Sequence, residues 1–162
     1  MSSVFAAIDL RPGGPADMAV VTTLMAEAFD PAYGEAWTAG QCLGILSLSG
    51  VWLTLASIDG APAGFALARS TLDEAELLLL ATSPRWRRRG VGGQLLRSVM
   101  RDAGDRGARK LHLEVRAGNA AIGLYQREGF SKTGERRNYY RGGSGGAFDA
   151  HSFMRLLDNF ER

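Results

Sequence analysis

A stretch of four arginines and three glycines, SPRWRRRGVGGQLL at residues 83–96, leads directly into an amphipathic segment. Consecutive backbone N–H groups at the start of a helix, together with the helix dipole, attract an anion. Glycines let the backbone approach a bulky phosphate and adopt turns that a side chain obstructs. The stretch therefore predicts a phosphate-holding loop; from the charge pattern alone, an arginine-rich solvated face or a nucleic-acid patch are the alternatives.

The residues around the glycines exclude two common phosphate loops. No Lys-Ser or Lys-Thr follows them, as a P-loop requires, and the Gly-x-Gly-x-x-Gly dinucleotide fingerprint is absent here. Binding of nucleic acid is disfavoured because Leu95, Leu96 and Val99 commit the following helix to the core.

The elements on both sides of this loop can be read from periodicity. The apolar run AELLLLAT before it indicates a strand covered on both faces, and the apolar stripe after it predicts a helix over residues 90–104. The segment KLHLEV alternates apolar and polar residues, which is typical of a strand. In NAAIGLYQREGF we expect a short helix that Asn119 caps and Gly129 ends.

The remaining elements complete a mixed sheet. We expect a helix over residues 18–29 with Asp17 as its cap, a weaker second helix before residue 50, and a hairpin of VWLTLAS and PAGFALARS that turns at Asp59-Gly60. The tail reads as two strands joined by the glycine-rich loop 142–146. Together these elements predict an α/β (α+β) fold.

Composition indicates one compact domain. The chain has 162 residues, of which 46% are hydrophobic, enough for a full core. Its net charge of +2, from 19 basic and 17 acidic residues, excludes a polybasic nucleic-acid binder. A lone Cys42 and the lack of a Cys/His cluster at ligand spacing predict no metal and a reducing compartment. With no basic leader and no run long enough to span a bilayer, we expect a cytoplasmic protein.

Two motifs resemble the GNAT superfamily of N-acetyltransferases. The pattern R-x-x-G-x-G at residues 87–92 is similar to its acyl-CoA pyrophosphate loop, and L-Y-x-x-x-G-F at residues 124–130 is similar to its second signature. The resemblance covers almost the whole chain and implies a GNAT fold of six to seven strands and about four helices, with acetyl-CoA as cofactor. The cofactor-binding residues it implies are Leu80, Ala81, Thr82, Arg87, Arg88, Arg89, Gly90, Val91, Gly92, Gly93 and Asn119.

Within the superfamily, the segments LEVRAGNAA, RRNYY and a late DA before an apolar strand are similar to the RimI family of bacterial ribosomal-protein alanine N-acetyltransferases. This resemblance implies a protein N-terminal peptide as acceptor, with the N-terminal alanine of ribosomal protein S18 expected. The segment from Glu114 to Tyr125 is one residue shorter than the spacing in that family. Either Asn119 or Gly118 therefore takes the family's Asn position.

Acetyl transfer from a thioester to an amine needs a base, a polarised carbonyl and an acid. The resemblance implies that Glu114 is the base, acting through a water, and that Tyr125 protonates the departing thiolate. Backbone N–H groups of residues 79–82 would polarise the carbonyl, where the strands of that superfamily part. From the residues alone, Glu114 can equally be a strand carboxylate paired with Arg116 or His112, and Tyr125 an ordinary core tyrosine.

The acceptor side is less specified by the sequence. Tyr33, Tyr139 and Tyr140 are candidates for lining the acceptor groove, with Glu35 and Glu135 as partners for an N-terminal ammonium; simple packing of surface loops is the alternative. Transfer to a small-molecule amine or to another protein N-terminus stays open. A regulatory module that binds acyl-CoA without turnover also stays open, although the presence of both expected catalytic residues argues against it.

Overall fold

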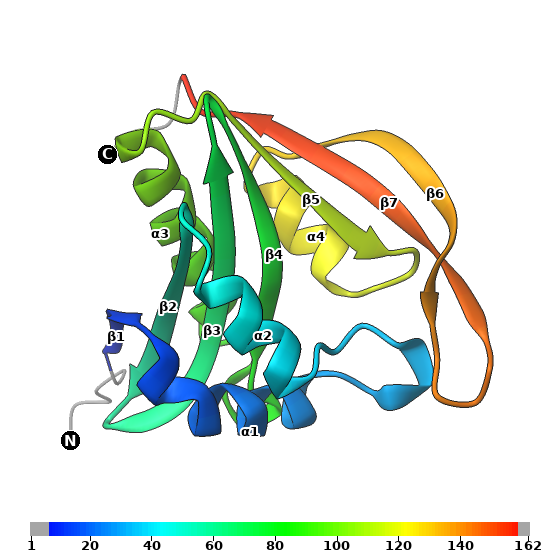
Figure 1. Ribbon diagram of the computed structural model, residues 1–162, viewed down its shortest axis with the longest axis horizontal. Coiled ribbons are helices and arrows are strands. Elements are labelled where there is room, and N and C mark those ends of the chain that lie inside the picture. The colour runs from blue at the N-terminus through cyan, green and yellow to red at the C-terminus, as the bar shows by residue number, and fades with distance from the viewer. Residues whose placement is uncertain (1–6, 159–162) are drawn as a thin grey trace.

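The computed structural model describes residues 7–158, which form seven strands and four α-helices (Figure 1). The strands are β1 (Ile8–Gly13), β2 (Val51–Ile58), β3 (Ala61–Thr71), β4 (Glu74–Thr82), β5 (Lys110–Arg116), β6 (Ser131–Arg141) and β7 (Ala147–Leu156). The helices are α1 (Met18–Ala28), α2 (Ala39–Leu46), α3 (Val91–Asp105) and α4 (Ala121–Arg127). The sheet order is β1-β2-β3-β4-β5-β7-β6; β4 and β5 run parallel and the other neighbours antiparallel. The predicted α/β architecture is confirmed.

Helices cover both faces of the sheet (Figure 1). On one face α1 and α2 bury side chains such as Leu24 and Met25 against β2 and β3. On the other face α3 and α4 bury Leu95, Leu96 and Val99 against the opposite side of the strands. Each helix presents a single apolar stripe to the core, which is why helical periodicity located α1 and α3 to within one residue at each end.

The two hairpins predicted from turn residues are present. Asp59 and Gly60 join β2 to β3, and their φ angles of +50° and +78° are the left-handed conformation that a two-residue hairpin turn requires. The glycine-rich segment 142–146 joins β6 to β7. In both cases the local residue types determined the turn.

Alternate side chains of β4 pack under α3 in the first half of the strand and under α1 in the second half. Its pairing with β3 shifts by one residue between Leu77 and Leu79, which leaves Leu78 as the extra residue of a β-bulge. Ala75 and Leu77 belong to the core under α3, whereas Leu79 and Ala81 belong to the core under α1. The unbroken apolar run fits this change of side, as expected for a strand covered on both faces.

Strands β4 and β5 part toward their carboxyl ends. Their parallel pairing ends at Leu77 and Leu113, although β4 continues to Thr82 and β5 to Arg116. Figure 1 shows β5 slanting away from β4. Because successive N–H groups of a strand point to opposite edges, about half of those in residues 79–82 face the gap. Backbone donors are therefore available to a ligand between the strands.

Asp17 and Asn119, the two residues predicted to cap helices, make different contacts. Asp17 ends a 3-10 turn, Pro15–Asp17, that leads straight into α1. Asp17 occupies the N-cap position of α1, as predicted, but its carboxylate makes no capping hydrogen bond to that helix. The carboxylate instead accepts a hydrogen bond from the Gly14 N–H at 2.9 Å and pairs with Arg11. Asn119 Oδ1 accepts a hydrogen bond at 2.8 Å from the N–H of Ala121, the first residue of α4. Asn119 thus satisfies one end group of α4, as predicted, from one residue before the N-cap position.

The described part of the chain excludes residues 1–6 and 159–162. The first of these ranges belongs to the segment in which a leader was sought. None of the helices within residues 7–158 has the length and apolar character needed to cross a membrane. Over the same range, no three His, Cys, Asp or Glu side chains are grouped so that they could hold a metal ion.

Candidate functional site

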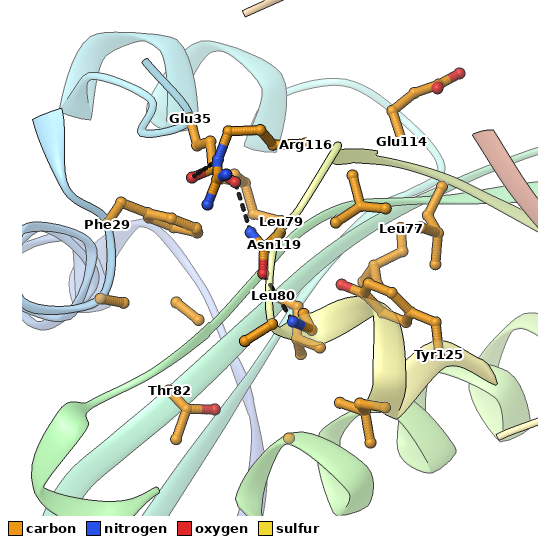
Figure 2. Close-up of a pocket in the computed structure, with 18 of the residues that line it drawn as sticks. Phe29, Glu35, Leu77, Leu79, Leu80, Thr82, Glu114, Arg116, Asn119 and Tyr125 are labelled. Carbon is orange, nitrogen blue, oxygen red and sulfur yellow. Dashed lines mark hydrogen bonds and ion pairs between the residues drawn. The ribbon is translucent and has the colours of Figure 1, made fainter. Parts of the chain in front are cut away.

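The gap between β4 and β5 opens into a pocket of about 660 Å³ (Figure 2). Its walls come from the loop between α1 and α2, the ends of β4 and β5, the loop before α3, and parts of α4 and β6. This volume lies within the range of small-molecule and cofactor sites. The sequence-predicted residues that line it are Tyr33, Glu35, Leu79, Leu80, Ala81, Thr82, Arg87, Arg88, Gly90, Val91, Gly92, Gly93, Glu114, Asn119, Tyr125, Tyr139 and Tyr140. The fold therefore brings the two expected catalytic residues and the expected cofactor loop to one cavity.

Backbone N–H groups gather at the start of α3. Arg88 and Gly90 have φ angles of +63° and +83°, and these two left-handed residues turn the chain into the helix. Among the described residues, no group accepts a hydrogen bond from the N–H groups of residues 91–93. Because the helix dipole adds to these donors, the position suits a phosphate group. The geometry of an anion loop is present, and its ligand stays a prediction.

Packing against α4 also requires glycine at position 92. A Cβ on Gly92 would lie 3.1 Å from Leu124 Cδ2 and 3.6 Å from Thr82 Oγ1. Helices α3 and α4 thus approach each other closely at the anion loop. Since Tyr125 follows Leu124 in the chain, the shape of this loop is coupled to the position of Tyr125.

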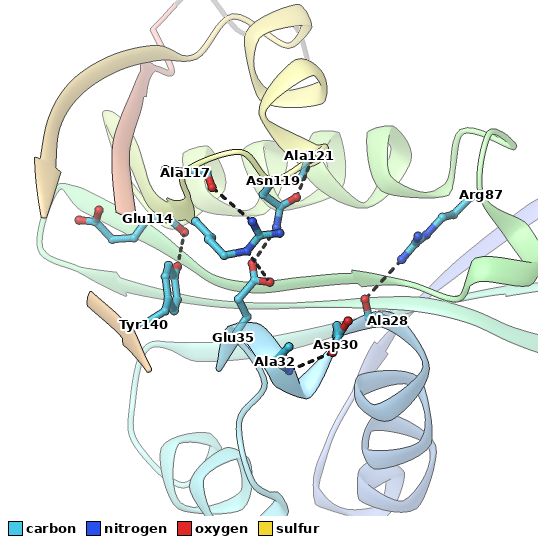
Figure 3. Close-up of polar contacts among 11 residues, drawn as sticks. Ala28, Asp30, Ala32, Glu35, Arg87, Glu114, Ala117, Asn119, Ala121 and Tyr140 are labelled. Carbon is cyan, nitrogen blue, oxygen red and sulfur yellow. Dashed lines mark hydrogen bonds and ion pairs between the residues drawn. The ribbon is translucent and has the colours of Figure 1, made fainter. Parts of the chain in front are cut away.

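Protein contacts already engage several arginine side chains of the loop. Arg87 donates a hydrogen bond at 3.3 Å to the carbonyl of Ala28, the last residue of α1 (Figure 3). The guanidinium groups of Arg85 and Arg89 each lie 5.8 Å from the centre of the Trp86 ring. Arg89 is also the one predicted cofactor-binding residue that does not line the pocket. The side chains of Arg85, Arg87 and Arg89 thus contact other protein groups, whereas the N–H groups of residues 91–93 are available to an anion.

Tyr125 is buried on α4, with its hydroxyl turned toward β4 (Figure 2). The side chain is 6% exposed and packs edge-on against Phe130, with ring centres 5.9 Å apart. Burial, and to a lesser extent the negative charge of Glu35, raises the pKa of Tyr125 far above the ordinary value of 10.0. The phenol is consequently neutral at physiological pH and carries a proton that it can donate.

Glu114 lies on β5 and directs its carboxylate away from Tyr125 (Figure 2). Its two oxygens are both engaged: Arg136 Nε donates to Oε1 at 2.9 Å, and Ser152 Oγ donates to Oε2 at 2.6 Å. The alternative partners expected from the sequence were wrong, because Arg116 pairs with Glu35 and His112 with Glu74.

A largely buried ion pair joins the loop after α1 to the end of β5 (Figure 3). Arg116 Nε donates to Glu35 Oε1 at 3.1 Å, and Asn119 Nδ2 donates to Glu35 Oε2 at 2.7 Å. The Arg116 and Glu35 side chains are only 14% and 9% exposed, and the guanidinium lies 3.7 Å from the centre of the Tyr33 ring. Arg116 was not among the site residues predicted from the sequence. It lies two residues after Glu114 in β5 and so shares a strand face with it, which was the available signal.

The loop after α1 is clamped against the β6–β7 hairpin, and the two lie side by side in Figure 1. Gly143 N–H donates to the Pro31 carbonyl at 3.0 Å. A Cβ on Gly34 or on Gly142 would lie 1.9 Å from a carbonyl oxygen of the facing segment, so only glycine fits at either place. The edge of the Tyr33 ring meets an aromatic ring of β7, with centres 5.2 Å apart. This clamp closes one side of the pocket.

Two neighbouring tyrosines of β6 form the wall beside Glu114. The rings of Tyr139 and Tyr140 meet edge-on with centres 4.9 Å apart, and the Tyr140 hydroxyl donates to the backbone carbonyl of Glu114 at 3.3 Å. Burial raises the pKa of Tyr140 well above 10.0, whereas Tyr139 is 48% exposed. Glu135, expected near the acceptor, instead pairs with Lys132 outside the pocket. Neither Glu35 nor Glu135 is thus free to meet an ammonium group.

Comparisons with known proteins agree with this geometry. Residues 20–130 match the Acetyltransferase (GNAT) family. The [ribosomal protein bS18]-alanine N-acetyltransferase of Escherichia coli (strain K12) is 45% identical over 83 residues, which is 51% of this chain and 56% of that protein. A protein of Bacillus subtilis named putative [ribosomal protein bS18]-alanine N-acetyltransferase is 37% identical over 83 residues, 51% of this chain and 55% of that protein. The match thus spans little more than half the length of these curated relatives.

Solved structures share the fold over a longer range. The crystal structure of the ribosomal-protein-S18-alanine N-acetyltransferase from Escherichia coli superposes with a TM-score of 0.82 at 28% identity, and covers 96% of this chain and 100% of that one. A structure of Arabidopsis thaliana NAA60 in complex with acetyl-CoA has a TM-score of 0.80 at 20% identity, over 94% of this chain and 100% of that one. At 20% identity this second likeness concerns the fold alone.

Proposed function

Because the chain belongs to the acetyltransferase (GNAT) family, we propose that it transfers an acetyl group from acetyl-CoA to the N-terminal amine of a protein. The acceptor we propose is the N-terminal alanine of ribosomal protein S18, for which the relatives in Escherichia coli and Bacillus subtilis are named. We also propose the cytoplasm as its compartment, since ribosomal proteins are made there. One observation carries the proposal: an anion-holding helix start, an unpaired strand edge and a buried neutral phenol share one pocket.

Acetyl-CoA, when bound, supplies an acetyl group activated as a thioester. The N–H groups of residues 91–93 would hold its phosphates, because they are free donors at a helix start. The N–H groups of residues 79–82 that face the gap would donate to the acyl oxygen and stabilise negative charge on it. Both sets of donors are fixed by the backbone and need no rearrangement at the moment of reaction.

Two side chains on opposite sides of the pocket move the protons. Glu114 accepts a proton from the amine through a water, which an α-amino group of pKa about 7.7–8.0 readily allows. Tyr125 donates its proton to the departing sulfur, whose thiol has a pKa of about 8.5 in water. Tyr125 is buried, and burial opposes the negative charge on a thiolate beside it as well as on the phenolate.

The aromatic wall supports a peptide rather than a small amine as acceptor. Tyr33, Tyr139 and Tyr140 lie beside Glu114 on the pocket wall opposite the anion loop, and they offer stacking surface to the first residues of a chain. Arg116 and Asn119 already hold Glu35, so we assign the base to Glu114, which lines the same pocket.

A turnover screen tests the function. Release of free coenzyme A is measured with peptides that begin Ala-Arg, peptides with other N-termini, and small amines. We expect turnover with the first group. Preference for small amines would support the alternative of a small-molecule transferase, and binding of acetyl-CoA without turnover would indicate a regulatory module.

The acid is tested by Tyr125→Phe, which keeps the ring and deletes the hydroxyl. Turnover should fall by about 10²- to 10⁴-fold, the usual contribution of a positioned acid, while acetyl-CoA affinity measured by calorimetry stays the same. A variant that turns over at the parent rate would exclude Tyr125 as the acid.

A further inference from the structure

We infer that Ser152 is a positioning residue for Glu114 and that its hydroxyl is needed for Glu114 to act as a base. The inference rests on the proposed function, in which Glu114 receives the proton of the amine. Ser152 lies on β7, opposite Glu114 in the pairing of β5 with β7. None of the sequence motifs includes it, because the two residues are 38 positions apart.

The contact between them has the geometry of a strong hydrogen bond. Ser152 Oγ lies 2.6 Å from Glu114 Oε2, within the range of O–H donors to a charged carboxylate. An ionised carboxylate only accepts, so the serine must donate. The Glu114 side chain is 16% exposed, which limits competition from water for this bond.

Backbone pairing fixes Ser152 more firmly than it fixes the other partner of Glu114. Ser152 is paired on both sides, with Glu114 of β5 and with Gly134 of β6. Arg136 lies on the edge strand β6 and reaches Oε1 from a side chain that is 62% exposed. Ion pairs at such exposed positions contribute little and exchange readily with water. The serine is therefore the partner that determines where the carboxylate points.

The Ser152 hydroxyl restricts the rotation of the Glu114 carboxylate. The last torsion of a glutamate side chain is broad and nearly two-fold, so an unheld carboxylate rotates over a wide range. A bond from Ser152 to Oε2 selects one rotation and still leaves each oxygen a second lone pair to accept a proton. Without that bond the exposed Arg136 would be the remaining side-chain partner and would draw the carboxylate toward solvent.

Kinetics of peptide acetylation test this role. Ser152→Ala should lower kcat by about 10- to 100-fold, the effect expected for loss of a hydrogen bond to a charged group, and leave KM for acetyl-CoA unchanged. Ser152→Thr keeps a hydroxyl on a β-branched side chain suited to a strand, and should restore most of the rate. Ser57→Ala on β2, outside the pocket, is the matched control and should behave like the parent.

A double-mutant cycle separates positioning from a purely structural effect. In a Glu114→Ala background the Ser152→Ala change should cost almost nothing, because no carboxylate remains to be held. Additive losses, or a Ser152→Thr variant as slow as Ser152→Ala, would overturn the inference.

Failure of the inference and failure of the proposed function give different results. If Glu114→Gln loses activity but Ser152→Ala does not, the positioning role is wrong and the base assignment stands. If the parent enzyme acetylates no N-terminal peptide, both are wrong.

Discussion

Breaking the largely buried ion pair between Glu35 and Arg116 should cost more stability than breaking an exposed pair of the described chain. Replacing Arg116 with Met keeps most of the side-chain volume and removes the charge. Glu35 would then be left 9% exposed with the Asn119 amide as its remaining side-chain partner. A carboxylate in that position must lose stability or move the loop after α1 toward water.

The expected loss in free energy of unfolding follows from the burial of Glu35. Removing one partner of a buried ion pair costs about 3–5 kcal/mol, and Asn119 and loop movement place Arg116→Met near the lower end, at about 3 kcal/mol. For a chain of this length each kcal/mol lowers Tm by about 2–4 °C, so Tm should fall by about 6–12 °C. The double variant Arg116→Met/Glu35→Gln leaves no unpaired buried charge and should recover part of this loss.

Urea denaturation and calorimetry measure these changes. Arg69→Met is the matched control, because Arg69 pairs with Glu76 at 3.2 Å but both side chains are 39% exposed. It should cost about 0–1 kcal/mol. An Arg116→Met variant no less stable than Arg69→Met, or a double variant whose loss is the sum of the single losses, would refute the reasoning from burial.

Three further predictions concern the loops and the tyrosines. Gly92→Ala should raise the Kd for acetyl-CoA measured by calorimetry, because its Cβ would lie 3.1 Å from a side chain of α4; Gly93→Ala, whose nearest contact is 3.8 Å away, should change the Kd much less. Gly142→Ala should raise KM for the peptide in steady-state assays while KM for acetyl-CoA stays constant, since its Cβ would meet a carbonyl of the loop after α1 at 1.9 Å and open the clamp. The free energy of unfolding, measured in urea from about one pH unit below to one unit above 10.0, should fall as pH rises. Burial raises the pKa of Tyr125 and Tyr140, so above 10.0 the unfolded chain releases protons that the folded chain keeps; replacing both with Phe should flatten the fall.

Local patterns identified most of the fold. Helical stripes, a two-residue turn and strand alternation depend on neighbours within a few residues, so α1, α3, β5 and the β2–β3 hairpin could be recognised directly. Asp17 was placed correctly at the start of α1, but the sequence did not indicate that the preceding Pro15–Asp17 turn engages its carboxylate.

The partners of the site residues could not be predicted in the same way. Glu35 and Arg116 are 81 positions apart, and Glu114 and Arg136 are 22 apart on strands that β7 separates in the sheet. The order of β5, β7 and β6 in the sheet follows from how residues 131–156 pack and not from local periodicity. The sequence therefore located many of the residues that line the pocket, whereas their ionic and hydrogen-bonding partners required the three-dimensional structure.

The bulge at Leu78 makes β4 a wall shared by two compartments. Residues before it complete the interior under α3, and residues after it complete the interior under α1. If Leu78 were instead taken into an even pairing with β3, Leu79 and Ala81 would turn to the wrong compartment. The interior under α3 and the interior under α1 therefore depend on the same strand. Their common boundary runs through one strand and through the pocket itself.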